Sequence, residues 1–242
     1  MVMQLIPIRR FILSCMAVLV VGALAMSCSS ESWEETMAAG QRAFQQQDYA
    51  SAERRFRTAV KQAEAFGRED RRVAVSLSQL AEVYAVQRRY VEAEPIYGRA
   101  LAVYQAVYGE DHADVAAVLN NLGVMHRLHG QFSEAEPLLK RALATKEKVY
   151  GPDHAEVAVT LGNLAQLYSA QGRFSEAEPY YRRALSVREK VLGDRHPEVA
   201  KSLEDYAVLL RTMGREKEAL PLESRAQGIR VQGAPRPTRS PR

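Results

Sequence analysis

The sequence predicts an all-α fold, a right-handed α-solenoid of about five stacked helix–turn–helix units. The first observation is a repeat: "YVEAEPIYGRAL", "FSEAEPLLKRAL" and "FSEAEPYYRRAL" begin at Tyr90, Phe132 and Phe174, 42 residues apart. A fourth copy keeps this register from Tyr206, and a fifth matches from Gln45 with a slip of one residue. A period of about 20 to 50 residues indicates stacked supersecondary units. The other two observations are helical apolar spacing and turn signals within each copy.

The first helix of each copy is predicted from its apolar face. Between about Val115 and Leu128, apolar side chains recur three and four residues apart, at Val115, Val118, Leu119, Leu122 and Met125. Gly130 and Gly172 follow and favour the left-handed conformation that ends a helix. Each copy therefore turns after its first helix.

The second helix is predicted to begin at the repeated serine. Ser133 and Ser175 are followed three residues later by Glu136 and Glu178, the spacing of a capping box. The repeated prolines then fall near the first turn, where a missing N–H costs least: Pro95, Pro137 and Pro179.

Packing between the two helices is predicted from small and aromatic residues. Alanines seven residues apart share one side of each second helix: Ala93 and Ala100, Ala135 and Ala142, Ala177 and Ala184, Ala219 and Ala226. Small side chains there let a partner helix approach closely. Tyr90, Phe132 and Phe174 are expected to fill the space beside them, and Trp33 to pack on the first helix pair.

The N-terminal segment has the pattern of a signal peptide. Residues 1–10 carry two arginines and no acid, and Phe11 to Ser27 are apolar without a charge. With Ser27 before Cys28, the segment resembles a bacterial lipoprotein precursor, whose cysteine is lipidated after cleavage. An ordinary cleaved signal peptide and an uncleaved N-terminal anchor remain alternatives.

The lipoprotein resemblance implies a covalent lipid on Cys28 and attachment to a membrane. Ser29 follows where an aspartate would favour the inner membrane, which implies the outer membrane facing the periplasm if the host has one. Both cysteines, Cys15 and Cys28, lie in this segment, so the remaining chain is held together without disulfides. No other cofactor is expected.

The organisation expected along the chain is a targeting segment, a helical array and a tail. We expect a signal peptide over 1–27, a lipidated N-terminus and spacer over 28–32, and a Pro- and Arg-rich disordered tail over 232–242. The array spans 33–231, with repeats near 33–67, 72–109, 114–151, 156–193 and 198–231.

The repeated residues resemble the tetratricopeptide repeat. The pattern of leucine, tyrosine, glycine, aromatic residue and two alanines is present, with a period of 42 in place of about 34. The link "VYGPDHAEVA" and its counterparts resemble the long repeats of kinesin light chains and related bacterial proteins. Arg88 replaces the glycine, His126 the tyrosine and Glu216 the aromatic residue, which puts the local geometry in question.

Composition and motifs argue against several function classes. The net charge is +4, but five of the 33 cations lie in the terminal segments, leaving 28 against 29 acids. Nucleic-acid binding needs a basic stripe that this body lacks. No nucleophile–base pattern or phosphate loop indicates an enzyme or a small-molecule substrate.

Three histidines occupy equivalent positions in successive repeats and could be considered as metal ligands: His112, His154 and His196. Equivalent residues two helices along are about 20 Å apart, since neighbouring helices pack about 8–10 Å apart. They cannot converge on a metal. The link "GPDH" instead indicates that Gly151 ends one helix and that Asp153 or His154 caps the next.

The resemblance implies a binding groove on the concave surface of the solenoid. The first-helix positions that would face it are Gln79, Glu82, Asn120, Asn121, Val124, Arg127, Asn163, Gln166, Ser169, Asp205 and Arg211. Gln79, Asn121, Asn163 and Asp205 repeat one polar position. These side chains either hold the backbone of a partner peptide or bond the neighbouring helix and stabilise the stack.

The function expected is that of a membrane-anchored scaffold that binds protein or peptide partners in the bacterial envelope. A structural component that self-associates through its convex face is an alternative. A carrier of lipid or glycan is a weaker one, because the mapped groove is polar.

Overall fold

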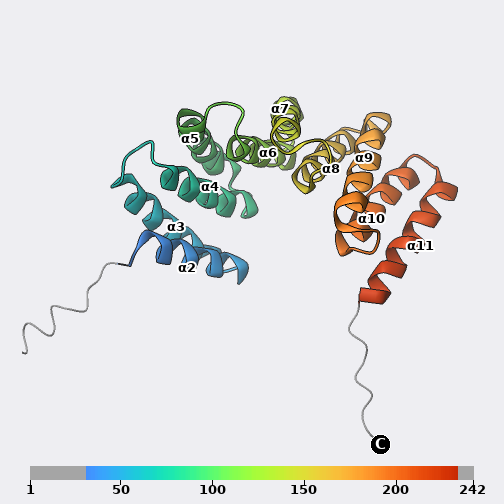
Figure 1. Ribbon diagram of the computed structural model, residues 1–242, viewed down its shortest axis with the longest axis horizontal. Helices are drawn as coiled ribbons and strands as arrows, with labels where there is room; N and C mark the ends of the chain where they lie inside the picture. Colours follow the sequence, from blue (N-terminus) through green and yellow to red (C-terminus); the bar gives the residue numbers. More distant parts are fainter. Residues whose placement is uncertain (1–30, 234–242) are drawn as a thin grey trace, which may run out of the picture.

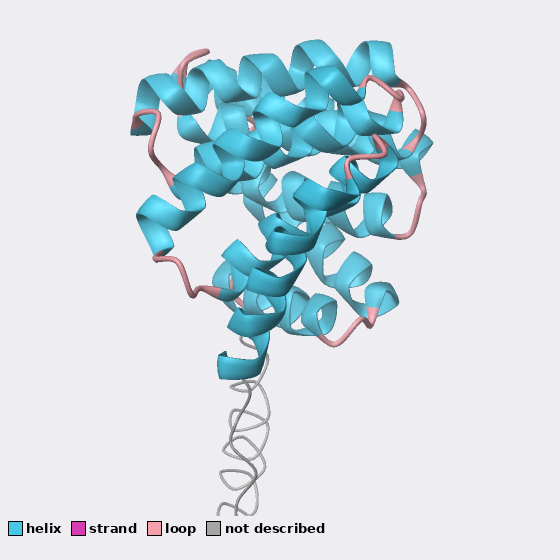
Figure 2. Ribbon diagram, turned by 90° about the vertical axis from the view of Figure 1, so that its right-hand side faces the viewer, coloured by secondary structure: helices cyan, strands magenta, loops and turns pink. Residues whose placement is uncertain are grey.

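The structure, a computed structural model, describes residues 31–233. Cys28, the predicted signal segment and the predicted tail beyond residue 233 lie outside the described residues. Within them the fold is all-α, and Figure 2 shows only helices and loops. The ten helices are α2 (Trp33–Gln45), α3 (Tyr49–Glu64), α4 (Arg71–Val86), α5 (Tyr90–Tyr108), α6 (Ala113–Leu128), α7 (Phe132–Tyr150), α8 (Ala155–Ala170), α9 (Phe174–Leu192), α10 (Pro197–Thr212) and α11 (Glu216–Gly233).

Consecutive helices pack as five antiparallel pairs, and the pairs stack into an arch (Figure 1). In this view α4, α6, α8 and α10 lie on the inner side, while α5, α7 and α9 lie on the outer side. The predicted solenoid of five helix pairs is confirmed. Among the described helices, none combines the length and apolar character that crossing a membrane would require.

The small residues of the second helices are buried as predicted. Ala135 and Ala177 are fully buried, and their partners seven residues later, Ala142 and Ala184, are 0% and 1% exposed. Phe132 and Phe174 pack against the same core. Close helix packing therefore follows directly from the repeated alanines.

The predicted capping boxes at Ser133 and Ser175 are wrong. The second helices α7 and α9 begin one residue earlier, at Phe132 and Phe174, and no side chain caps them. The chain reaches them through a glycine with positive φ, as at Gly130 (φ 82), so the turn is fixed by the backbone. Pro137 consequently lies at the sixth position of α7, beyond the first turn.

The turn signals elsewhere have the expected roles. Gly151 ends α7, and of the two candidate caps it is His154 that accepts a hydrogen bond at Nδ1 from a backbone N–H, that of Glu156 (3.1 Å). Arg88, which replaces the usual glycine, adopts the same left-handed conformation with φ of 60°. The substitution changes the residue and preserves the turn.

Three of the junctions between consecutive pairs carry the same cluster of a tyrosine, a glutamate and an arginine. In each, the tyrosine hydroxyl donates to the glutamate (2.8–3.1 Å) and the arginine pairs with its other oxygen (2.6–2.8 Å). The clusters are Tyr84–Glu53–Arg89, Tyr168–Glu136–Arg173 and Tyr206–Glu178–Arg215. The glutamate of the expected capping box thus joins two repeats.

The N-terminal pair is fastened to the next pair by the side chain of Trp33. Its Nε1 donates to Oγ of Ser76, a fully buried residue of α4, at 2.8 Å. Trp33 lies at the first position of α2. The expected packing on the first pair therefore extends to the second pair.

Candidate partner-binding groove

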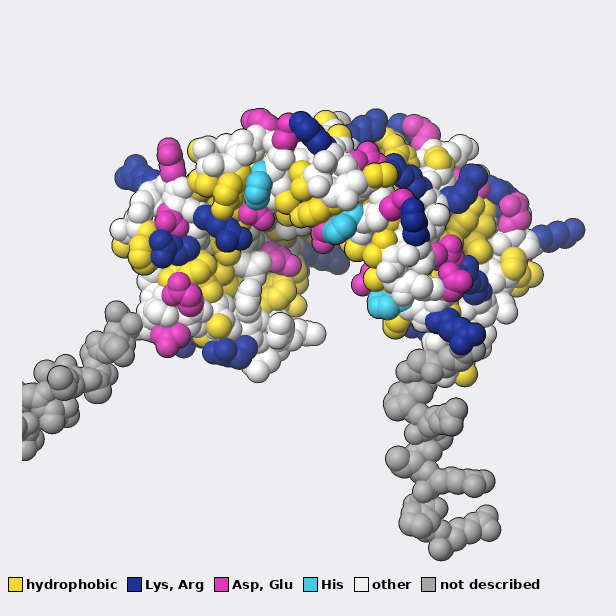
Figure 3. All heavy atoms as spheres, viewed as in Figure 1, with side chains coloured by type: hydrophobic (Ala, Val, Ile, Leu, Met, Phe, Trp, Pro, Cys, Tyr) yellow, Lys and Arg dark blue, Asp and Glu magenta, His cyan; other side chains and the backbone are white. Residues whose placement is uncertain are grey.

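The candidate groove is the inner side of the arch, formed by the first helix of each pair. The inner helices also contact each other directly, α4 with α6 and α6 with α8. Figure 3 shows the hollow beneath the arch, with apolar and charged side chains both present on its visible edges. All eleven predicted groove residues belong to α4, α6, α8 or α10.

A cavity of about 300 Å³ opens between α4, α5, α6 and α8. Five of its lining residues are among the predicted groove residues: Glu82, Asn120, Asn121, Val124 and Asn163. The remaining five are Ala85, Val86, Tyr97, Met125 and Leu128, and they are predominantly apolar. The structure thus gathers the central part of the predicted groove around one concave, largely apolar site.

Two neighbouring helices are linked by amides in this cavity. Asn163 Nδ2 in α8 donates to Asn120 Oδ1 in α6 at 2.8 Å, and Asn120 Nδ2 donates to Asn121 Oδ1 at 3.3 Å. Asn120 is only 7% exposed. The bond between Asn163 and Asn120 stabilises the stack, whereas Asn121 Nδ2 has no hydrogen bond to any residue of 31–233.

The α4 wall of the cavity carries a carboxylate. Glu82 is half-buried, and Gln79 Nε2 donates to its Oε2 at 3.2 Å. Burial raises the pKa of Glu82, and the hydrogen bond from Gln79 partly opposes this shift. Burial, together with the nearby Glu82 charge, also raises the pKa of Tyr97, which lines the same cavity.

The remaining predicted residues of α6 and α8 flank the cavity without lining it. Arg127 is half-buried, and its Nε is buried with no hydrogen-bond partner within 31–233. This burial lowers the pKa of Arg127. Gln166 and Ser169 are half-buried on α8.

The predicted residues of α10 are engaged within their own helix pair. Asp205 pairs with Lys201 one turn earlier, and Arg211 pairs with Glu216 and Glu223 of α11, both at 2.5 Å. Neither lies at the cavity. A binding role for these two residues stays a prediction.

The apolar floor of the cavity was not predicted from the sequence. The predicted groove residues all lie on first helices, whereas Tyr97 belongs to the second helix α5. Val86 and Leu128 repeat one position 42 residues apart and are 48% and 53% exposed. Both are the last residues of their helices, α4 and α6. A large apolar residue repeated at this position is the sequence feature that could have predicted the floor.

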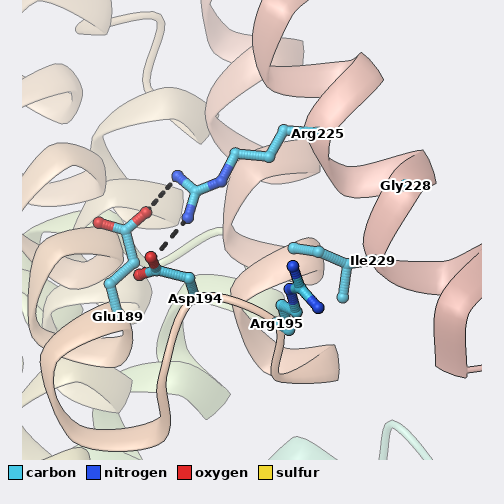
Figure 4. Close-up of a pocket in the computed structure, with 6 residues that line it drawn as sticks. All are labelled: Glu189, Asp194, Arg195, Arg225, Gly228 and Ile229. Atoms are coloured by element: carbon cyan, nitrogen blue, oxygen red, sulfur yellow. Dashed lines mark hydrogen bonds and ion pairs between the residues drawn. The ribbon is translucent and has the colours of Figure 1, made fainter.

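A wider surface depression of about 490 Å³ lies between the α9–α10 link and α11 (Figure 4). Arg225 projects from α11 and pairs with both Glu189 and Asp194 (3.7 Å to the latter). These charges satisfy each other and stabilise the last repeat. The depression is therefore a weaker candidate than the cavity on the inner side.

The three link histidines have a structural role. His112, His154 and His196 each accept a backbone hydrogen bond at Nδ1 at the start of an inner helix (3.1–3.2 Å). Within residues 31–233, no three His, Cys, Asp or Glu side chains are placed to hold a metal ion.

Comparison with known families identifies the repeat. A model of the tetratricopeptide repeat matches three overlapping segments, residues 72–148, 134–190 and 174–230. A search of curated proteins gives no match.

Several solved structures share the fold. BtubC (BKLC) from P. vanneervenii is 25% identical with a TM-score of 0.74, and the match covers 95% of this chain and 90% of that chain. A putative kinesin light chain with TPR-like repeats from Podosopora anserina is 22% identical with a TM-score of 0.71, covering 82% and 94%. A Rap protein complexed with Competence and Sporulation Factor is 16% identical with a TM-score of 0.72, covering 90% of this chain and 59% of that one.

Proposed function

Since the chain belongs to the tetratricopeptide repeat family, with repeats like those of kinesin light chains, we propose that it is a non-catalytic scaffold. It binds an extended segment of a partner protein on the inner side of the arch. The observation that carries this proposal is the cavity of about 300 Å³ between α4, α5, α6 and α8. Its apolar floor and amide rim are the features that bind a peptide side chain and backbone.

The repeat architecture supports this function. Solenoids of stacked helix pairs use their extended concave surfaces to bind partners. A Rap protein of similar fold is complexed with Competence and Sporulation Factor. The fold alone does not name the partner of this chain, so the proposal depends on the cavity.

The second part of the proposal is a membrane anchor. The apolar segment Phe11 to Ser27 followed by Cys28 has the pattern of a lipoprotein signal peptide. We propose that lipid on Cys28 holds the arch at the bacterial envelope, at the outer membrane where there is one. Mass spectrometry of the N-terminal peptide tests this directly. Absence of lipid, or unchanged membrane fractionation of Cys28→Ala, would contradict it.

The partner-binding role is tested with matched variants of two exposed apolar residues. Leu128→Glu places a charge in the cavity floor, and Val91→Glu makes the same change at an outer-helix residue that is 79% exposed. We expect the first to abolish capture of partners from detergent-solubilised envelopes and the second to retain it. Retention of every partner by Leu128→Glu would refute a groove function.

The amides require separate variants because they differ in bonding. Asn121→Ala is expected to weaken partner binding several-fold and, because it removes only the long 3.3 Å bond from Asn120, to lower the melting temperature less than Asn163→Ala does. Asn163→Ala also removes the 2.8 Å bond to Asn120 and should cost about 1 kcal/mol of stability. Circular dichroism melting of both variants separates the two effects.

A self-associating structural part is the second candidate. Val107, Val149 and Val191 repeat one exposed position near the ends of the outer helices (41–42% exposed). Such a row is suited to contact with a second copy. A mass that rises with concentration in light scattering, and that is abolished by Val149→Glu, would favour this candidate over a monomeric adaptor.

A further inference from the structure

We propose that the cavity between α4, α5, α6 and α8 selects a partner segment in which a large apolar side chain is adjacent to a lysine or arginine. The apolar side chain enters the floor, and Glu82 binds the cation. This proposal rests on the proposed function and specifies the chemistry of its ligand.

The first argument is the state of Glu82. It is the one charged residue among the ten that line the cavity. Within residues 31–233 no lysine, arginine or histidine nitrogen lies within ion-pairing distance of it, and Gln79 is its hydrogen-bond donor. A half-buried carboxylate without a cation is energetically unfavourable. A ligand cation would relieve this cost.

The contrast with other half-buried glutamates strengthens this argument. Glu53, Glu136 and Glu178 have similarly low side-chain exposure (15–23%), and each pairs with an arginine of the next repeat. These residues complete the internal structure of the stack. Glu82 differs because it has no arginine partner within residues 31–233 and lines the cavity that a partner would occupy.

The second argument is the apolar floor beside Glu82. Val86 and Leu128 are about half exposed, whereas Tyr97 and Met125, which line the same cavity, are 2% and 1% exposed. The volume of about 300 Å³ is at the lower end of the range for ligand sites. A cavity of this volume accommodates one or two side chains of a partner. An apolar side chain bound there would bury the exposed surface of Val86 and Leu128.

The third argument concerns register. Asn121 stands on the rim with a free amide nitrogen, and a side-chain amide can both donate to and accept from a peptide backbone. At the positions equivalent to Glu82 in later repeats the chain has Val124, Gln166 and Val208. The cation is therefore recognised at one place only, which fixes the partner segment along the groove.

The test is a selection from a random peptide display library on the full chain in mild detergent. Enriched peptides are then synthesised and titrated by fluorescence anisotropy. We expect enrichment of a large apolar residue next to Lys or Arg. Glu82→Gln should weaken these peptides about tenfold, since charge-assisted hydrogen bonds are the stronger ones. Glu69→Gln, which removes an exposed charge from the α3–α4 link, should leave affinity unchanged.

Charge reversal makes the test specific. Glu82→Lys should lose the basic peptides and gain affinity for the same peptides with Glu in place of Lys or Arg. Peptides that bind, depend on Asn121 and Leu128, but lack a basic residue or ignore Glu82→Gln would overturn this inference and leave the proposed function standing. A library that yields no peptide dependent on Leu128 would overturn both.

Discussion

The junction between α5 and α6 differs from the other three junctions between helix pairs. Those three have a tyrosine hydroxyl and an arginine on one glutamate, and in two of them the guanidinium also lies over the tyrosine ring, 4.2–4.4 Å from its centroid. At the α5–α6 junction, His126 and Gln131 replace the tyrosine and arginine. His126 Nδ1 bonds Gln131 Oε1 at 2.7 Å, while its Nε2 lies 3.9 Å from Glu94.

The difference shows that the repeats keep the same spacing of their helices even where the side chains that join them differ. Helices α5 and α6 form the same junction of the repeat as α3–α4, α7–α8 and α9–α10, yet they are the least closely packed of the four. Tyr97 of α5 and Met125 of α6 also form the cavity floor. The least strongly fastened junction is thus where the candidate binding site lies.

The largest effect should come from breaking one of the strong clusters. Glu136→Ala removes the acceptor of the Tyr168 hydroxyl and the glutamate that ties Arg173 to the preceding repeat, although Arg173 keeps its pair with Glu176. We expect it to lower the free energy of unfolding by about 2 kcal/mol. The equivalent Glu94→Ala should change it by less than about 0.5 kcal/mol, because Glu94 is 52% exposed and distant from His126.

Urea unfolding followed by circular dichroism measures both variants. Each removes one glutamate at the same repeat position, so each is the control for the other. Equal losses would mean that the tyrosine–glutamate–arginine clusters do not distinguish the junctions.

A smaller effect is expected from installing the missing cluster. His126→Tyr with Gln131→Arg restores the pattern around Glu94, with Glu134 retained as the second partner of the arginine. We expect a gain of about 1 kcal/mol and slower amide hydrogen exchange in α5 and α6. Gln131→Arg alone is the control and should not stabilise, because it removes the acceptor of His126.

The smallest expected effect is on the pH dependence of stability, through Glu136. The hydrogen bond from Lys140, with those from Arg173 and Tyr168, lowers the pKa of Glu136 from 4.5 to about 2. Between these values the unfolded chain binds more protons, so stability present at neutral pH is lost as pH falls below about 4.5. From pH 7 to pH 4, Glu136→Gln should lose roughly half a kcal/mol less than the native chain, allowing for solvent screening. Thermal melts at both pH values test this, and identical pH dependence would contradict it.

The sequence was sufficient for the fold because its signals are local and repeated. The alanines, the link glycines and the apolar spacing act within one or two helices, and a fixed period places each pair against the next. The start of α7 could not be located from the "SEAEP" motif, because the spacing of Ser133 and Glu136 also fits a capping box at Ser133. Only contact with Tyr168 and Arg173 of the next repeat shows that Glu136 has another role.

The candidate site was predictable only in part. Register placed Asn120, Asn121 and Asn163 on one surface, but it could not show that Asn120 and Asn163 bond each other. Tyr97 lies on the outer helix α5, and it lines the cavity only because of how the helix pairs pack. That Glu82 lacks a cation is likewise visible only in three dimensions.

The bond between Trp33 and Ser76 gives the molecule an optical label of its own. The chain contains one tryptophan, and its indole N–H bonds Ser76 Oγ across the first junction at 2.8 Å. Intrinsic fluorescence therefore reports separation of α2 from α4, whereas the far-ultraviolet signal averages over every helix. If unfolding begins at the first helix pair, which is next to the membrane in the proposed function, fluorescence changes before the far-ultraviolet signal. If it begins elsewhere in the arch, the far-ultraviolet signal changes first.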